Sequence, residues 1–458
     1  MTRNRWTLPV TAGAGFLAGL DTTAVNLALP DIQRSLASGP GEVQWVVNSF
    51  ALLSAALLVT AGDLADRFGR RRVFVLGLLT FAGSSAACGL ATSMLVLDLA
   101  RAAQGATAAV VAASGLALLV GIYPPAERGR ALGISGAIAA LSFVVGPLVG
   151  GVLTDTLGWR SVFLVNLPVA TGIALAARAA LPELRDRSRR QGPARFDYVG
   201  VATFTLGLAA LLYAALRGGA IGWAEPEVMA AATVGVSALA AFVVLERRTP
   251  DGVVDLRLFH DRTFAGAVAT TALGGGAYFG TLVYLSLFLQ GTQHYGPTET
   301  GVVYLPTILP FMIISPFAGR LLARIPGAPV PTVGVGLIAC GMLLLLGVDE
   351  GAGLLDVAPG MAVAGIGTGL AVTPLTHLAL AQVPTERSGM ASGVLQTARP
   401  VGVTIGVTVL GLAVPHQLDA AAFHAVAVLA AGIAAVGALT AAVTIRASVR
   451  SRIDACQT

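Results

Sequence analysis

Long apolar runs separated by short polar segments fill almost the whole chain of 458 residues. Most runs contain about 20 residues, the length at which an apolar α-helix crosses the ~30 Å hydrocarbon core of a bilayer. The first run is too long for the apolar part of a secretory signal peptide, so it is also predicted to be a membrane helix. The pattern predicts an all-α polytopic membrane protein with fourteen transmembrane helices, at residues 7–30, 43–61, 73–91, 94–120, 131–153, 161–181, 197–217, 227–245, 263–290, 300–323, 330–348, 354–380, 389–413 and 420–446.

Arginine residues are distributed unevenly over the segments that join these helices. All 29 basic residues of the chain are Arg. With a cytoplasmic N-terminus, 24 of them lie in inner segments, three (Arg34, Arg160 and Arg217) in outer segments and two (Arg101 and Arg399) within helices. Because short cytoplasmic loops of membrane proteins are enriched in Arg and Lys, this bias supports the helix count and predicts that both termini are cytoplasmic.

Two short motifs occur twice at nearly the same spacing. The motif Gly62-x-Leu64-x-x-Arg67 returns 257 residues later, and a motif that begins at Pro125 returns 259 residues later at Pro384. Such a repeat is typical of transporters built from two related halves. The first six predicted helices end at residue 181, so a six-helix half is much shorter than the spacing between the two copies. The excess is long enough for two more helices with their loops, which are therefore expected between the halves. The predicted domains are residues 1–181, an N-terminal six-helix bundle; 182–262, a basic linker with two inserted helices; 263–446, a C-terminal six-helix bundle; and 447–458, a cytoplasmic tail.

The polar segment from Gly62 to Arg72 joins the second and third predicted helices. Its glycines allow close helix approach or a left-handed turn, and its acidic and basic residues can form ion pairs that hold one arrangement of the helices. The residues predicted to form this conformational latch are Gly62, Asp63, Asp66, Arg67, Gly69, Arg70 and Arg71. The alternative is an ordinary cytoplasmic loop whose charges are solvated.

Ionisable residues within membrane helices cost roughly 2.5–3.5 kcal/mol each on insertion scales, so they indicate function. Asp21 and Arg101 lie at similar depths below the outer face and are expected to face each other, with Gln104 in the same motif as Arg101. Asp98 precedes Arg101 by one turn and is an alternative partner for it. We interpret Asp21 as a carboxylate that exchanges a proton when substrate binds; the alternative is a static Asp–Arg pair that fixes helix packing.

Arg399 lies in the middle of the predicted helix 389–413. We expect no acidic partner for it from its own helix or from neighbouring helices of the second half. It must therefore bind backbone carbonyls, a carboxylate of the first half or an anionic ligand. A direct role in transport and a structural role both remain open.

The predicted helix 131–153 contains the residues Gly146, Pro147, Gly150 and Gly151. Glycines allow another helix to pack closely, and Pro147 removes a backbone hydrogen bond and is expected to kink the helix. The alternative is a general small-residue packing face.

Several classes of function are disfavoured by the residues that the chain contains. Without a Lys, it cannot form a P-loop, whose Lys binds phosphate groups. Its sequence contains no nucleophile constellation, metal-ligand cluster or disulfide framework. We therefore predict that the protein is not an enzyme, holds no metal or cofactor and does not bind nucleic acid, in spite of its net charge of +5. An ion gradient or a substrate gradient would drive its work.

The chain resembles the fourteen-helix drug:proton antiporters of the major facilitator superfamily in the following motifs: Leu20 to Pro30, Gly62 to Arg72, Arg101-x-x-Gln104-Gly105, Gly146-Pro147-x-x-Gly150-Gly151, and Pro384 to Arg399. The resemblance implies alternating access between two six-helix bundles and export of small hydrophobic or amphipathic drugs in exchange for protons. It implies that Asp21 is a proton or substrate site, that Arg101 assists proton coupling, that Asp66 belongs to the latch and that Gly146 marks an antiporter helix. It also implies a monomer in the cell membrane that needs only the proton gradient and no cofactor.

The second-half copy of the latch has Ala323 where the first has Asp66, so the first-half segment is expected to be the main lock. Two other functions remain open. One is export of a single metabolite, such as an amino acid, a siderophore or a sugar product, which a single-substrate resistance profile would favour. The other is a non-transporting membrane receptor or scaffold, against which the ionisable residues inside the membrane count.

Overall fold

The computed structural model describes residues 6–38, 40–43, 45–183, 197–248, 254–293, 295, 297–325, 327–383, 387–414 and 419–457, which form helices and connecting turns without a β-strand. The first half contains α1 (Thr7–Ser35), α2 (Pro40–Val43), α3 (Trp45–Phe68), α4 (Arg70–Gly89), α5 (Met94–Ile122), α6 (Pro125–Leu157), α7 (Arg160–Leu164) and α8 (Asn166–Ala180). The central segment contains α9 (Tyr198–Ile221), α10 (Pro226–Glu246) and the 3-10 helix η2 (Leu256–His260). The second half contains α11 (Arg262–Gly291), α12 (Pro297–Val303), α13 (Leu305–Arg324), α14 (Pro329–Leu344), η3 (Leu345–Gly347), α15 (Leu354–Ala381), α16 (Ser388–Gly411) and α17 (Ala420–Gln457).

The described residues contain 12 helices that are long and apolar enough to cross a membrane, or 13 when the two parts of α1 count as one span. The two parts of α1 meet at an angle of 58° between Asn26 and Ala28. The bend has a steric cause, because the ring of Pro30 would clash in a straight helix with the carbonyl four residues earlier, which belongs to Asn26. The 33-residue helix α6 contains positions whose side chains lie outside the described part, and it is not among the 12. The polytopic all-α fold is confirmed, and the number fourteen stays a prediction.

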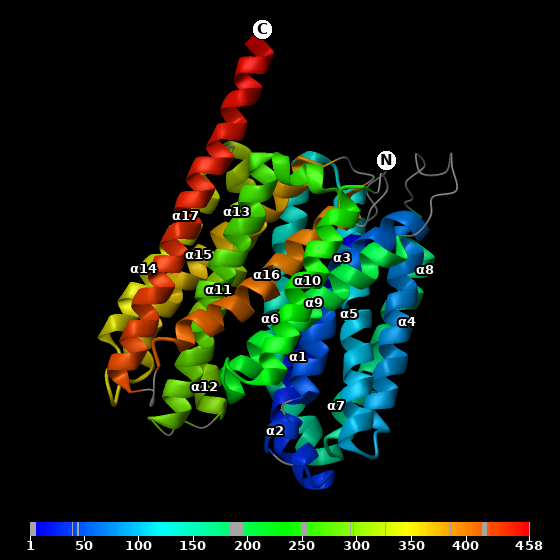
Figure 1. Ribbon diagram of the computed structural model, residues 1–458, viewed down its shortest axis with the longest axis vertical. Coiled ribbons are helices and arrows are strands. Elements are labelled where there is room, and N and C mark those ends of the chain that lie inside the picture. The colour runs from blue at the N-terminus through cyan, green and yellow to red at the C-terminus, as the bar shows by residue number, and fades with distance from the viewer. Residues whose placement is uncertain are drawn as a thin grey trace.

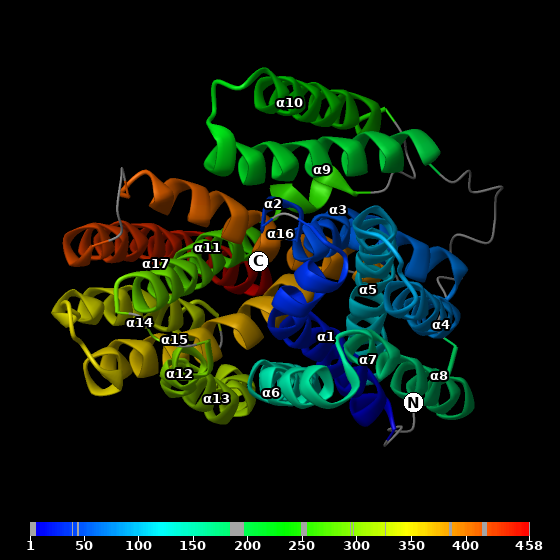
Figure 2. The same cartoon turned by 90° about the horizontal axis from the view of Figure 1, so that it is seen from below.

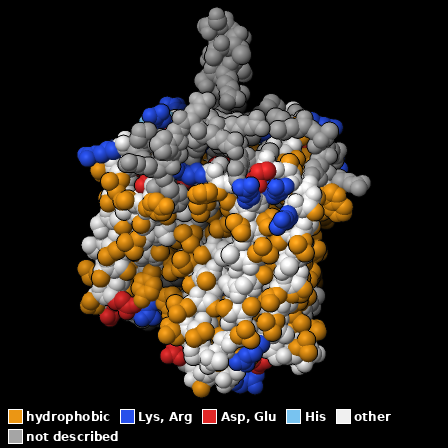
Figure 3. Space-filling model, turned by 90° about the vertical axis from the view of Figure 1, so that its right-hand side faces the viewer, with side chains coloured by type: hydrophobic (Ala, Val, Ile, Leu, Met, Phe, Trp, Pro, Cys, Tyr) orange, Lys and Arg blue, Asp and Glu red, His pale blue; other side chains and the backbone are white. Residues whose placement is uncertain are grey.

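On the face shown in Figure 3, exposed apolar side chains cover the middle of the molecule, and most charged side chains lie toward its two ends. The pattern is strongest on α10, where Met229, Val234, Val236 and Val244 are all exposed. A soluble protein would not expose so much contiguous apolar surface. This belt is the surface that the bilayer covers.

The helices form two bundles that are joined by a hairpin (Figures 1 and 2). In the first bundle α1 packs against α6, α3 against α5, and α4 against α5 and α8. In the second, α11 packs against α16 and α17, and α14 and α13 both pack against α15. The helices α9 and α10 pack against each other, and α9 also contacts α3 and α16, one helix from each bundle. The predicted domain boundaries stay predictions, although this grouping follows the same order along the chain.

Two seams join the bundles, one between α3 and α16 and the other between α6 and α13. The two copies of the repeated Gly-x-Leu motif lie on α3 and α13, which stand at different seams. The other repeated motif begins α6 in its first copy and directly precedes α16 in its second, and these two helices are the partners at the two seams. Equivalent helices of the two halves therefore occupy equivalent places at the two seams. This is the arrangement expected for two halves related by a twofold axis.

Candidate functional site

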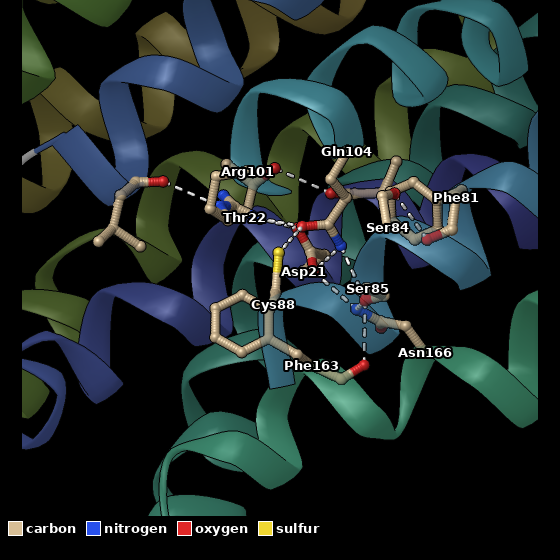
Figure 4. A network of polar contacts seen from close by, with 12 residues as sticks. Asp21, Thr22, Phe81, Ser84, Ser85, Cys88, Arg101, Gln104, Phe163 and Asn166 are labelled. Atoms are coloured by element: carbon tan, nitrogen blue, oxygen red, sulfur yellow. Dashed lines mark hydrogen bonds and ion pairs between the residues drawn. The ribbon is translucent and has the colours of Figure 1, made fainter. Parts of the chain in front are cut away.

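A network of hydrogen bonds lies inside the first bundle, with Asp21 of α1 at its centre (Figure 4). One oxygen of the Asp21 carboxylate accepts from Arg101 Nη1 at 2.7 Å. The other accepts from Gln104 Nε2 at 2.9 Å and from Asn166 Nδ2 at 2.6 Å. Asp21, Arg101, Gln104 and Asn166 are all 0% exposed. The expected meeting of Asp21 and Arg101 is confirmed, and the functional role given to the pair stays a prediction.

Ser85 of α4 and Asn166 of α8 complete this network, and neither was singled out from the sequence. Ser85 Oγ accepts from Gln104 Nε2 at 2.8 Å and from Asn166 Nδ2 at 2.9 Å, and it donates to the carbonyl of Phe163 at 3.0 Å. Asn166 lies where the predicted helix 161–181 breaks into α7 and α8. An amide two residues before Pro168 in an otherwise apolar run was the signal that could have revealed it.

The guanidinium group of Arg101 is held from several sides. Its Nη1 donates to Gln104 Oε1 at 2.7 Å as well as to Asp21, and its Nε donates to the carbonyl of Val46 on α3 at 2.8 Å. It also lies 4.3 Å from the centre of the Phe50 ring, a distance that allows cation–π attraction. The charge of Arg101 therefore ties together α1, α3 and α5.

Asp98 does not replace Asp21 as the partner of Arg101, so that alternative was wrong. Asp98 is partly exposed near the outer end of α5, and its buried Oδ1 atom has no hydrogen-bond partner among the described residues. Although the two residues are one turn apart, Arg101 points into the bundle and reaches α1. The contacts of Arg101 with Asp21 on α1 and with the carbonyl of Val46 on α3 replace the local contact between Asp98 and Arg101.

The chemistry of this network follows from its enclosure. Three donors satisfy the two oxygens of the buried Asp21 side chain, which would otherwise lack partners inside the bundle. If Asp21 gained a proton, it would lose its charge attraction to Arg101 and leave that cation buried without a counter-charge. The charge of Asp21 is thus coupled to the position of α5 relative to α1. No group of three or more His, Cys, Asp or Glu side chains in the described ranges could hold a metal ion.

The predicted latch is buried and forms ion pairs. Asp63 contacts Arg67 Nε at 2.5 Å, and Asp66 accepts from Arg70 Nε and Nη2 at 3.0 and 2.9 Å. Arg70 also donates to the carbonyl of Ala117 on α5 at 3.2 Å. Asp63, Asp66 and Arg70 are each less than 5% exposed. The alternative of a loop with solvated charges was wrong, because the helices close over these side chains.

One contact of the latch crosses between the bundles. The second carboxylate oxygen of Asp66 accepts from the backbone N–H of Met390 at 2.9 Å. Met390 lies in the first turn of α16, where backbone N–H groups have no partner within the helix. Asp66 therefore stabilises the N-terminal end of α16 and the contact between α3 and α16 together.

Gly69 and Arg71 of the latch segment make their contacts within the first bundle. Gly69 has a φ of 102°, a conformation that favours glycine, and it allows α4 to begin directly after α3. The backbone N–H of Arg71 donates to Glu183 Oε1 at 3.2 Å, and its Nη1 donates to the carbonyl of Leu181 at 2.9 Å. Arg71 thus fastens the end of the first bundle rather than the contact between bundles.

Glycines bring the two bundles into backbone contact at both seams. A Cβ atom on Gly62 would lie 2.1 Å from the carbonyl oxygen of Gly389, and one on Gly393 would lie 2.5 Å from that of Leu58. At the other seam, a Cβ on Gly319 would lie 2.3 Å from the carbonyl oxygen of Gly129. Atoms at these distances overlap, so only glycine fits. Both seams lie at the end of the molecule that is predicted to face the cytoplasm.

The glycines predicted to mark an antiporter helix pack α6 against α1. A Cβ atom on Gly146 would lie 1.8 Å from Thr23 Oγ1, and one on Gly150 would lie 2.6 Å from the carbonyl oxygen of Ala24. These contacts agree with the alternative of a small-residue packing face, and they lie two and three residues after Asp21. Gly151 is only partly buried, and the side chain of Pro147 lies outside the described part, so the predicted kink stays a prediction.

Arg399 lies at the middle of α16 and is exposed. Its Cγ atom is 3.4 Å from the position of a Cβ on Gly275 of α11. Among the described residues no hydrogen bond or ion pair joins its guanidinium group to another side chain. The structure therefore does not bring Arg399 into the Asp21 network.

Comparison with known proteins places this architecture among transporters. Residues 11–407 match the family model of the Major Facilitator Superfamily. The chain is 40% identical to the multidrug resistance protein Stp of Mycobacterium tuberculosis (strain CDC 1551 / Oshkosh), over 92% of this chain and 78% of that protein. It is 36% identical to the puromycin resistance protein pur8 of Streptomyces alboniger, over 89% of this chain and 81% of that protein. Among solved structures it is similar to the human organic anion transporter MFSD10 (TETRAN), with a TM-score of 0.71, 17% sequence identity and coverage of 96% of this chain and 100% of that chain.

Proposed function

Because the chain belongs to the major facilitator superfamily, we propose that it exports small hydrophobic or amphipathic drugs, antibiotics among them, in exchange for protons. Relatives that cover most of the chain are named for multidrug resistance and puromycin resistance. The proposal places the protein in the cell membrane as a monomer with both termini in the cytoplasm. It requires no cofactor, since the proton gradient supplies the work.

The contacts between the bundles support an alternating-access cycle. In the described conformation, Gly62 and Gly389 close one seam and Gly129 and Gly319 close the other. With the predicted topology, this conformation is closed toward the cytoplasm. Export also needs a second conformation in which α3 separates from α16, so that a molecule can enter from the cytoplasm. Breaking the Asp66 hydrogen bond to Met390 is part of that step.

The observation that carries the proposal of proton coupling is the enclosed carboxylate of Asp21. A carboxylate with three donors inside a membrane protein is costly to assemble, and such residues mark proton and substrate pathways. A proton on Asp21 would weaken its bond to Arg101 and release α5 from α1. Since α5 also holds Arg70 of the latch through the carbonyl of Ala117, this change can reach the seam between the bundles.

Proton exchange by inside-out membrane vesicles tests the proposal. Vesicles acidified by respiration and loaded with a pH-sensitive dye report proton release when puromycin or another drug is added. We expect drug-dependent proton release with the wild type and none with Asp21→Asn. Asp31→Asn is the matched control, because Asp31 lies on the same helix in a solvent-accessible pair with Arg34. Full drug-dependent proton release by Asp21→Asn, at equal protein content, would remove Asp21 from the coupling mechanism.

A further inference from the structure

Arg399 carries a charge at mid-membrane depth that the latch and the Asp21 network do not use. It lies midway along α16, and its side chain is exposed although those of Thr397 and Ala398 just before it are 6% and 8% exposed. An arginine at this depth that faced lipid would be expensive. Its surroundings must therefore supply water or a negative charge.

The direction of the Arg399 side chain follows from other contacts of α16. Ser392 lies seven residues earlier, almost two turns, and so on nearly the same face of the helix. Ser392 Oγ donates to the carbonyl of Ala113 on α5 at 3.3 Å, which shows that this face points toward the first bundle. Ile405, which is 56% exposed, is about 240° around the helix from Arg399 and marks the lipid side. Arg399 therefore points between the two bundles.

The position of Arg399 along α16 explains why its side chain is exposed. The two bundles are in backbone contact at Gly389 and Gly393. Arg399 lies ten residues beyond Gly389, or about 15 Å farther from the closed end. Arg399 therefore lies beyond the glycine contacts, on the side away from the closed end, and its side chain is exposed there.

The nearby helices hold no acidic side chain that is free to neutralise Arg399. Neither α16 nor α11, which packs against it at Gly275, contains an Asp or Glu. In the first bundle, Asp21 is enclosed by its own donors, and Asp66 is bound to Arg70. On α5, the nearest acidic residue toward the outside is Asp98, close to the end of the helix. The positive charge of Arg399 therefore has no counter-charge from these helices, and a bound anionic ligand would supply one.

We infer that Arg399 binds a negatively charged group of the transported molecule, so that carboxylates, phenolates and enolates ionised at neutral pH belong to the substrate range. The planar fork of an arginine fits such oxygen anions and holds them through two parallel hydrogen bonds. The aliphatic part of Arg399 lies against α11 beside Gly275. This inference rests on the proposed export function, for which it names a substrate class.

Two dyes with the same ring skeleton and opposite charges test this inference. Binding of fluorescein, an anion, and rhodamine 123, a cation, is measured by fluorescence polarisation with the purified full-length protein in detergent. We expect Arg399→Gln to weaken fluorescein binding about 10-fold to 100-fold, the usual range for losing a charged hydrogen bond. Rhodamine 123 binding should stay unchanged or become tighter. Arg399→Lys should recover part of the fluorescein affinity, because it keeps the charge but not the fork.

Arg217→Gln is the matched control, since Arg217 lies at the predicted outer end of α9 in an exposed pair with Glu227. It should leave both affinities unchanged. The inference is overturned if Arg399→Gln binds fluorescein as the wild type does, if both dyes weaken equally, or if the wild type does not bind fluorescein. A thermal unfolding curve like that of the wild type, together with rhodamine binding, shows that the variant is folded.

Efflux of the same dyes from loaded cells separates this inference from the proposed function. If Arg399→Gln still exports rhodamine 123 but the wild type never transports or binds fluorescein, export stands and the anion site fails. If fluorescein binding depends on Arg399 but the wild type exports neither dye, the anion site stands and export of these compounds fails.

Discussion

A single methyl group at position 62 should open the seam between α3 and α16. In Gly62→Ala, the new Cβ atom would lie 2.1 Å from the carbonyl oxygen of Gly389 and 2.7 Å from its carbonyl carbon. Both are backbone atoms of a helix, so no side-chain rotation can relieve the overlap. The two helices must move apart until the contact reaches the ordinary distance of 3.4 Å.

The separation needed is about 1.3 Å, and it would stretch the hydrogen bond from Met390 N–H to Asp66 from 2.9 Å to beyond hydrogen-bonding range. A hydrogen bond to a charged group contributes about 1.5–3 kcal/mol. Its loss would lower the ratio of closed to open conformations at this seam by about 10-fold to 100-fold, before any loss of packing is counted.

Distances between spin labels measured by pulsed electron paramagnetic resonance test this shift. Labels at Arg72 of α4 and Arg324 of α13 are both exposed and lie on different bundles at the same end. We expect a longer distance component to appear in Gly62→Ala. Gly83→Ala is the matched control, because a Cβ on this glycine of α4 would meet no atom within 4 Å. Identical distance distributions for Gly62→Ala and the wild type would refute the argument that this contact holds the seam closed.

Two predictions concern stability and are measured by unfolding of the purified protein in denaturant. Arg101→Gln leaves Asp21 buried without its counter-charge and should lower the free energy of unfolding by about 3–5 kcal/mol. Adding Asp21→Asn should restore part of this loss, and a double variant as unstable as the sum of the single ones would contradict the pairing. Gly105→Ala places a Cβ 2.2 Å from the carbonyl oxygen of Phe50 and should cost about 1–3 kcal/mol by forcing α3 and α5 apart. Gly336→Ala, whose Cβ would meet nothing within 4 Å, should cost much less, and equal losses would contradict this account.

The meeting of Asp21 and Arg101 could be predicted because it depends on only two regular quantities. Helices that cross the same bilayer in opposite directions rise by the same amount per residue, so the distance of each residue from the outer end sets its depth. Asn166 could not be found in this way. It lies at a break between α7 and α8, where helical periodicity no longer sets the direction of a side chain.

The latch shows a second limit of sequence analysis. Ion pairs such as Asp66 with Arg70 follow from the i,i+4 spacing once the residues are known to be helical. The contact from Asp66 to the N–H of Met390 joins residues 324 positions apart, and no local pattern contains it. Its donor is a backbone group, which any residue type would supply. Only the packing of the two bundles determines this partner.

The central hairpin gives the molecule two unlike flanks within the bilayer. The helix α9 contacts both α3 and α16, and its side chains Leu208 and Leu212 form an apolar cluster with Ala55 of α3 and Val401 of α16 (Figure 2). Farther along α9, Tyr213 stacks on Trp45. This flank is therefore covered by the hairpin, whereas α6 and α13 lie on the side away from the hairpin, where α15 contacts both of them. The inserted hairpin therefore separates the lipid from the seam between α3 and α16 and leaves the seam between α6 and α13 without such a shield.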